Sequence, residues 1–311
     1  MEIKGYKKDF SGLGLRMVLA AVAIYGVQIV SQYVVLAIHG EWIRNMNIML
    51  AATMIPMYAV GFPVAFWIMR RGVAEQTIEK HSMSPLQILM AFFMSYAILM
   101  AGNIIGLLVT MGIGIVKGEP VINNLAEVVG SGNIWISAIY MVLLAPVFEE
   151  YLFRRLICNR VLPYGQGMAI AISGLLFGLF HGNFNQFFYA FFLGCFFAFI
   201  YVKTGRLRYT IILHMMVNFM GSVVGGLLLQ NVDLEQISAS GMIISALYLL
   251  FVFGIVIAGA VLLLANLSKL KADTGEITIA KGKRFETAIV NVGMVLYCVI
   301  FLVMMVIQAF V

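Results

Sequence analysis

The chain has 311 residues, of which 62% are hydrophobic and 11% are charged, and its mean hydropathy is +1.00. Soluble domains contain about 45–50% apolar and about 25% charged residues, so this composition excludes both a water-soluble globule and a disordered chain. The long unbroken apolar runs also disfavour a β-barrel, whose strands would alternate in short segments. The sequence therefore predicts an all-α fold, a polytopic bundle of about eight or nine transmembrane helices that forms one membrane domain over residues 1–311.

Nine apolar runs are candidate spans, because a helix needs about 20 apolar residues to cross a bilayer. In chain order they are 15–39, 46–69, 85–116, 134–162, 167–183, 185–203, 207–229, 241–266 and 287–311. The first run follows a basic N-terminal segment, but it is too long for the apolar region of a signal peptide and lacks a clear cleavage site. We therefore expect the first run to be a retained span.

The basic residues divide unevenly between the two sides of the predicted bundle. If the N-terminus is cytoplasmic and the sides alternate, all but two of the 20 Lys and Arg residues fall in cytoplasmic segments, and only Arg44 and Lys117 lie outside. This asymmetry agrees with the positive-inside rule. It predicts a multi-pass protein of the cell membrane with a cytoplasmic N-terminus, in contact with the lipid bilayer and without a nucleic-acid partner.

The fourth run contains two adjacent carboxylates, Glu149 and Glu150, well inside apolar sequence. Ionisable groups at membrane depth are costly unless they have partners, so they suggest function. Glu150 and Arg154 are four residues apart and could form a structural ion pair on one helix face, but this pair leaves Glu149 unexplained. Pro146 precedes the glutamates and frees the carbonyl of Val142, which favours a kink there.

Two histidines, His181 and His214, lie inside later apolar runs. Each could simply bond to a backbone carbonyl, although a pair of them beside a double glutamate makes that interpretation less attractive. Asn218 follows His214 by four residues and therefore shares its helix face, and Phe177 precedes His181 at the same spacing.

The distances along the helices place these polar residues near one level. Glu149 lies about 15 residues before the turn at 163–166 and His181 about 16 residues after it, so a rise of about 1.5 Å per residue brings both to the same depth. His214 and Asn218 can reach this level if the first hairpin extends further into the cytoplasm. We therefore expect one cavity that holds all four residues and opens to the cytoplasm.

Such a set of side chains is typical of a hydrolase. A carboxylate near a histidine can act as a general base on water, and a histidine with an asparagine amide can donate hydrogen bonds to a developing oxyanion. The zinc motif HExxH and the serine motif GxSxG are both absent from the sequence. Glu149, His181 and His214 could nevertheless bind zinc, which commonly takes three protein ligands at catalytic sites.

Three motifs in order on successive helices resemble those of the CPBP intramembrane proteases, a family that includes CAAX prenyl endopeptidases and bacterial Abi and bacteriocin-immunity proteins. They are EExxxR (Glu149, Glu150, Arg154), FxxxH (Phe177, His181) and HxxxN (His214, Asn218). The resemblance covers residues 134–229, the expected catalytic core, whereas 230–311 would be peripheral spans.

The resemblance implies a catalytic set of Glu149, Glu150, His181, His214 and Asn218. Glu149 would activate water with help from His181, and His214 with Asn218 would stabilise the oxyanion, while Glu150 would support the site together with Arg154 and Phe177. The family has been described both as metal-dependent and as metal-free. The asparagine, where a third strong metal ligand would otherwise stand, favours a site without a cofactor, and zinc remains the alternative.

The sequence thus predicts an intramembrane endopeptidase that hydrolyses a peptide bond near the cytoplasmic face, in a peptide, a membrane-anchored protein or a CAAX-type protein. One alternative is a non-catalytic immunity or scaffold protein of the same fold. Another is a proton-coupled transporter, since buried Glu and His also form proton relays. A transporter would show two matched halves, whereas the sequence has one polar cluster.

Overall fold

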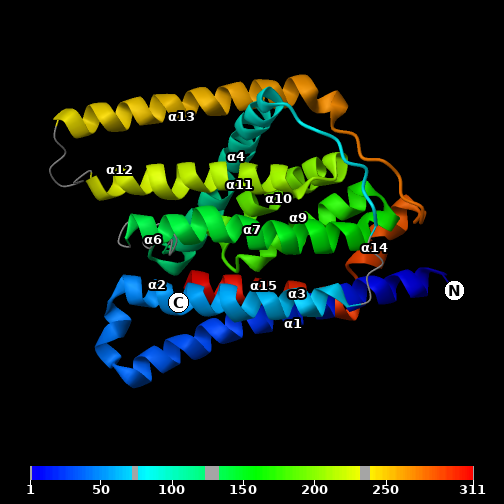
Figure 1. The fold of residues 1–311 in the computed structure, drawn as a ribbon, viewed down its shortest axis with the longest axis horizontal. Helices are drawn as coiled ribbons and strands as arrows, with labels where there is room; N and C mark the ends of the chain where they lie inside the picture. The colour runs from blue at the N-terminus through cyan, green and yellow to red at the C-terminus, as the bar shows by residue number, and fades with distance from the viewer. Residues whose placement is uncertain (1, 72–75, 123–132, 232–238, 311) are drawn as a thin grey trace.

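A computed structural model describes residues 2–71, 76–122, 133–231 and 239–310 (Figure 1). These residues form helices and no strand, which confirms the all-α prediction. Within them, eight helical segments are long and apolar enough to cross a membrane. They are Ile3–Ile38, Met46–Arg70, Pro85–Lys117, Ile134–Tyr164, Phe184–Thr204, Leu207–Leu228, Ala239–Lys269 and Val292–Phe310.

The fifth predicted span is shorter in the structure. Helix α9 (Gln166–Phe180) has 15 residues, which corresponds to about 22 Å of helix, against a hydrocarbon core of about 30 Å. The other differences are at the ends of the chain. Helix α1 (Glu2–Ile38) includes the basic N-terminal segment, and the ninth predicted span is divided into α14 (Arg284–Ala288) and α15 (Val292–Phe310).

Among the eight spans of the described residues, five are continuous or nearly so, whereas three contain wider, π-helical turns. The continuous helices are α1, α4 (Pro85–Lys117), α10 (Phe184–Thr204), α13 (Ala239–Asn266) and α15. The first interrupted span consists of α2 (Met46–Pro56), a π turn at Met57–Gly61 and α3 (Phe62–Arg70). The second consists of α6 (Ile134–Ala138), a π turn at Ile139–Leu144, α7 (Ala145–Glu150), a π turn at Tyr151–Cys158 and α8 (Asn159–Val161). The third consists of α11 (Leu207–Asn218), a π turn at Phe219–Val224 and α12 (Gly225–Asn231).

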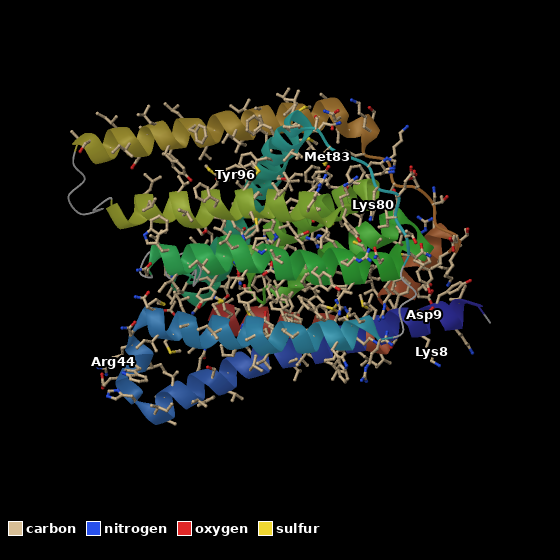
Figure 2. All side chains as sticks on the ribbon, in the orientation of Figure 1. Lys8, Asp9, Arg44, Lys80, Met83 and Tyr96 are labelled. Carbon is tan, nitrogen blue, oxygen red and sulfur yellow. The ribbon has the colours of Figure 1, made fainter. Side chains whose placement is uncertain are left out.

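One end of the bundle carries most of the basic residues, and we call it the basic end. Here α1 begins, α3 and α10 end, and the segment before α14 returns to the bundle. Lys7 pairs with Glu286 at 2.7 Å and Lys203 with Asp273 at 2.7 Å. Figure 2 shows Lys8 and Lys80 at this end and Arg44 at the other, and Figure 1 shows the two termini at opposite ends.

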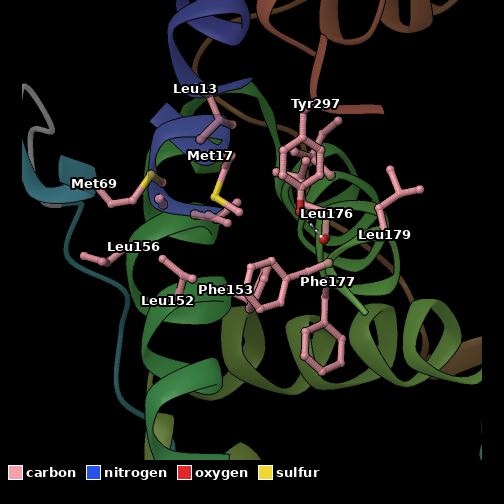
Figure 3. Packing of buried hydrophobic residues seen from close by; sticks show 14 of the residues in the cluster. Leu13, Met17, Met69, Leu152, Phe153, Leu156, Leu176, Phe177, Leu179 and Tyr297 are labelled. Atoms are coloured by element: carbon pink, nitrogen blue, oxygen red, sulfur yellow. Dashed lines mark hydrogen bonds between the residues drawn. The ribbon is translucent and has the colours of Figure 1, made fainter. Parts of the chain in front are cut away.

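A shared apolar core joins α1, the Ile134–Tyr164 span, α9 and α15 (Figure 3). Leu13 and Met17 of α1 are at most 1% exposed, as are Leu152 and Phe153 of the Ile134–Tyr164 span. The terminal helices α1 and α15 therefore pack against one side of the central ones and belong to the same packed unit, although they are remote in sequence.

Side chains from α1 and α15 satisfy the backbone at the end of α9. The last carbonyls of a helix lack partners within the helix, and inside a membrane no bulk water can replace those partners. The Tyr25 hydroxyl of α1 donates to the carbonyl of Phe180, and the Tyr297 hydroxyl of α15 donates to the carbonyl of Leu176 at 2.9 Å (Figure 3). Tyr25 therefore satisfies one of the last four carbonyls and helps α9 to stop at membrane depth, whereas Tyr297 binds the carbonyl just before them.

The chain then turns sharply into α10. Gly182 adopts a left-handed φ of +64°, a conformation that costs little without a Cβ. Asn183 caps α10, because its side-chain oxygen accepts a hydrogen bond from the N–H of Gln186 at 2.9 Å, while its amide nitrogen donates to the carbonyl of His181 at 2.9 Å. The turn thus fixes His181 directly after the end of α9, inside the bundle.

Close packing of α4 on α10 should be essential for stability. A Cβ at Gly102 of α4 would overlap the Cα of Tyr189 in α10, whereas a Cβ at Gly112 of the same helix would meet nothing within 4 Å. We expect Gly102→Ala to lower the free energy of unfolding by about 1–3 kcal/mol. Gly112→Ala, the matched control, should be neutral or stabilising by up to about 1 kcal/mol because alanine favours helix. Unfolding of both variants in detergent checks this, and equal stabilities would contradict it.

The ion pairs of Glu286 predict a pH dependence at the basic end. Hydrogen bonds from Lys283 and Lys7 hold the pKa of the Glu286 carboxyl at about 2, below its ordinary value of 4.5. The folded protein therefore binds this proton less readily than the unfolded chain, so the stabilisation is complete above about pH 4.5 and is lost as the pH falls toward 2.

Glu286→Gln should accordingly remove part of the loss of melting temperature between pH 4.5 and pH 2. Melting temperatures of the purified protein across this range measure the effect. Glu276→Gln, which removes an exposed carboxylate on the preceding loop, is the control for the change in net charge. A wild-type pH profile in the Glu286 variant would contradict the assignment.

Candidate active site

The two glutamates lie on α7, a short helix between two π turns. Within the first turn the N–H of Ala145 donates to the carbonyl of Tyr140, five residues back. In the same register Pro146 would donate to Met141, but proline has no N–H. The free carbonyl is therefore that of Met141, not that of Val142 as the sequence analysis expected, because the turn is π-helical and not α-helical.

Asn218 of α11 supplies the hydrogen bond that the carbonyl of Met141 lacks. Its amide nitrogen donates to the carbonyl of Met141 at 2.7 Å. A side-chain amide has two N–H groups, so this bond leaves a second donor on the same nitrogen. Asn218 thus connects α11 to the kinked span, and it also lines the cavity described below.

Glu150 and Arg154 form the expected ion pair, and both side chains are 0% exposed. Arg154 Nη2 donates to Glu150 Oε1 at 3.1 Å, and Arg154 Nε lies 3.0 Å from Glu150 Oε2 without the alignment of a hydrogen bond. Arg154 Nη1 donates to Ser173 Oγ of α9 at 3.0 Å, and the guanidinium lies over the Phe177 ring at 4.8 Å from its centroid. The pair therefore binds the fourth span to α9.

His214 of α11 lies between the two glutamates. Its Nδ1 is 3.0 Å from Glu150 Oε1, and its Nε2 is 3.9 Å from Glu149 Oε2. Since the carboxylate paired with Arg154 can only accept, Nδ1 carries the proton of that hydrogen bond. This bond orients the ring and directs Nε2 toward Glu149. The Phe177 ring packs edge-on against the imidazole, with the ring centroids 5.9 Å apart.

His181 is held at the C-terminal end of α9, the short helix that ends at Phe180. Its Nδ1 lies 2.9 Å from the carbonyl oxygen of Phe177, and the Phe177 ring packs edge-on against it at 4.9 Å between centroids. A carbonyl only accepts, so Nδ1 is the donor and Nε2 of the neutral ring is left as an acceptor. His181 thus makes the bond to a backbone carbonyl that the sequence allowed for an isolated histidine. This bond orients the ring, which also lines the cavity.

Glu149, His181, His214 and Asn218 all line one cavity of about 510 Å³, which Glu150 and Arg154 do not reach. The Glu149 side chain is 16% exposed, whereas that of Glu150 is fully buried. Tyr58, Tyr140 and Tyr189, together with several methionines and leucines, cover the remaining wall. The structure thus places the four residues together, as the motif spacing predicted, and separates the solvent-accessible glutamate from the buried one.

An adjoining cavity of about 450 Å³ shares His181, Asn185 and Gln186 with the first and continues to Met46. Met46 begins α2 at the end of the bundle away from the basic residues (Figures 1 and 2). The two cavities therefore extend from the middle of the bundle away from the basic end. The expected opening lay on the side of the basic residues, whereas α9 stops short and leaves space beyond His181 on the other side.

Three polar residues of the site were missed in the sequence. The Ser173 hydroxyl accepts a hydrogen bond from Arg154, and Thr210 is fully buried on α11 one turn before His214. Ser222 lines the cavity and donates to the carbonyl of Asn218 at 2.6 Å. A signal for them was present, since Thr210 and Ser222 extend the His214–Asn218 spacing by four residues in each direction, and Ser173 stands four residues before Phe177.

The alternative that Glu149, His181 and His214 bind zinc stays a prediction. Among the described residues, no three His, Cys, Asp or Glu side chains come together as a metal ion requires. Nδ1 of His181 and Nδ1 of His214 bond to Phe177 and Glu150, so the Nε2 atoms are the ring nitrogens that could coordinate a metal ion.

The buried ion pair predicts a large cost for losing one partner. Arg154→Met would leave Glu150 charged and unpaired, and breaking a buried pair typically costs about 3–5 kcal/mol. Arg44→Met, which breaks an exposed pair with Glu41, should cost about 1 kcal/mol or less. Denaturation of both variants in detergent tests this. The double variant Glu150→Leu/Arg154→Met should recover much of the loss, and no recovery would contradict an electrostatic origin.

Comparisons with known proteins agree with the motifs. Residues 131–220 match the family model described as type II CAAX prenyl endopeptidase Rce1-like. No curated protein and no solved structure matched the chain. The matched stretch contains every residue of the three motifs and runs from before α6 to the π turn after α11. Residues 131–220 are thus similar to an Rce1-like type II CAAX prenyl endopeptidase domain, which is consistent with the CPBP family.

Proposed function

We propose that this protein is an intramembrane endopeptidase in which Glu149 activates a water molecule. The observation that carries the proposal is the position of Glu149. It is the accessible member of the glutamate pair, it faces His214 Nε2 at 3.9 Å, and it lines the same cavity as His181 and Asn218. Glu150 is bound to Arg154 and His214 and has no access to the cavity.

In the proposed first step the Glu149 carboxylate takes a proton from water while the water oxygen attacks the scissile carbonyl carbon. His181 Nε2 accepts a hydrogen bond from the second O–H of the water and so orients the water molecule. The negative charge that develops on the carbonyl oxygen receives hydrogen bonds from the second N–H of Asn218 and from the Nε2–H of His214, which in this scheme is doubly protonated because its Nδ1–H donates to Glu150.

In the second step the tetrahedral intermediate collapses and the C–N bond breaks. The Glu149 carboxylic acid returns its proton to the leaving nitrogen, so Glu149 ends the cycle as a carboxylate. Glu150 touches no reacting atom in this scheme. It acts through His214, whose ring it orients, and Arg154 maintains Glu150 in its charged form.

The cavity favours substrates that combine a peptide with apolar groups. Its wall is largely aromatic and aliphatic, and the polar side chains of the lining include Glu149, His181, His214 and Asn218. Such a lining suits an apolar peptide, a membrane-anchored protein or a CAAX-type protein. Because the cavities extend toward the end without basic residues, we propose that the scissile bond is bound at mid-bundle depth, further from the basic end than the sequence analysis expected.

Glu149→Gln tests the proposal most directly. The substitution keeps the size of the side chain but removes the base, so we expect cleavage of a prenylated CAAX peptide panel by purified protein to fall by about 10²–10⁴-fold. Its melting temperature should stay near that of the wild type, because the Glu150–Arg154 pair is intact. Glu79→Gln at an 85% exposed side chain is the matched control and should retain activity. Full activity of Glu149→Gln would refute the assigned role.

The same assay with a strong chelator addresses metal dependence. Activity that survives the chelator supports the scheme above, whereas activity restored only by added zinc would replace it. Binding of the peptides without cleavage by wild-type protein would favour the non-catalytic alternative.

A further inference from the structure

A cavity of about 720 Å³ at the basic end shares no residue with the cavity of Glu149. We call it the basic-end cavity. It is formed by the first turns of α1, by the end of the Ile134–Tyr164 span and by Ile277. The proposed hydrolysis makes no use of it, and its charged side chains are Lys8, Asp9, Arg16 and Arg160.

Two of these cations lack a neutralising partner. Arg160 Nη2 donates to the carbonyls of Met69 at 3.2 Å and Arg71 at 2.9 Å, while its Nη1 is buried without a hydrogen-bond partner among the described residues. Arg16 is close enough to Arg160 for their like charges to repel. No described residue forms an ion pair with Arg16.

The single carboxylate of the lining does not compensate for these charges. Asp9 accepts a hydrogen bond from the Tyr164 hydroxyl at 2.6 Å and interacts with Arg160 over a longer range. Three cations and one anion therefore face the cavity. Two guanidinium groups that line one cavity, of which Arg160 has an unbonded N–H, favour an anion there, and phosphate is a group that arginine recognises well.

The surroundings favour a phosphate that belongs to a lipid. Leu15 lines the cavity and is 42% exposed. Leu19 and Val22, at 56% and 64% exposed, continue from it along one face of α1. The spacing of four and then three residues gives an apolar stripe that runs from the cavity into the membrane-spanning part of the helix. Basic pockets between transmembrane helices are known binding sites for anionic head groups.

We propose that the basic-end cavity binds the phosphate group of an anionic phospholipid between Arg16 and Arg160, with the acyl chains along Leu15, Leu19 and Val22. Lys8 at the rim adds to the positive potential. Figure 2 shows Lys8 and Asp9 at this end, far from Arg44. The bound lipid would fix the start of α1 against the end of the Ile134–Tyr164 span.

Lipid binding by the delipidated full-length protein in neutral detergent tests this proposal. The probes are phosphatidylglycerol, phosphatidylcholine and inorganic phosphate, and native mass spectrometry gives the dissociation constants. We expect phosphatidylglycerol to bind more tightly than phosphatidylcholine. Arg16→Gln should weaken the binding of phosphatidylglycerol about fivefold to tenfold, and Arg44→Gln at the opposite end should not weaken it.

Arg16→Gln should fold because it removes no ion pair, and its lipid-free melting temperature checks this. If that variant were unstable, Lys8→Gln at an exposed position should still weaken binding severalfold. Equal affinity for the two lipids, or unchanged affinity in the folded Arg16 variant, would overturn the proposal. Binding of inorganic phosphate as tight as that of phosphatidylglycerol would overturn the lipid source.

Discussion

The salt bridge between Glu150 and Arg154 determines how the central helices are arranged. Both side chains are removed from solvent, and an unpaired charge there would cost several kcal/mol. Each charge therefore needs its other partners as well. Arg154 reaches Ser173 on α9, and Glu150 reaches His214 on α11. One ion pair thus connects three segments and orients the imidazole that faces Glu149.

The second constraint is the backbone of a helix that stops inside the membrane. Helix α9 ends at Phe180, where lipid could not satisfy its last carbonyls. The Tyr25 hydroxyl of α1 takes this role for Phe180, and the Tyr297 hydroxyl of α15 bonds to the carbonyl of Leu176 just before the helix end. Helices α1 and α15 therefore help to hold His181 in place, although both lie outside the residues that match the family model.

Much of the site follows from local patterns. The spacing of four residues places Glu150 with Arg154 and His214 with Asn218, because a helix returns to the same face at that interval. Thr210 and Ser173, which continue the same spacing, could have been found by the same reasoning. The hydrogen-bond partner of Asn218 could not have been found in this way. The carbonyl of Met141 is free only because the turn before Pro146 is π-helical, and a sequence pattern does not distinguish that turn from an α-helical one.

The sequence by itself determined that the chain is a helical membrane protein, which helices carry polar residues and which end of the bundle is basic, since hydropathy and charge are local properties. Only the tertiary structure decided that α9 is too short to span, that Glu149 is accessible while Glu150 is buried, and that the cavities extend away from the basic end. These features depend on contacts between residues more than 60 positions apart, such as Glu150 with His214 and Phe180 with Tyr25. No local pattern contains them, because each is the result of packing several helices together.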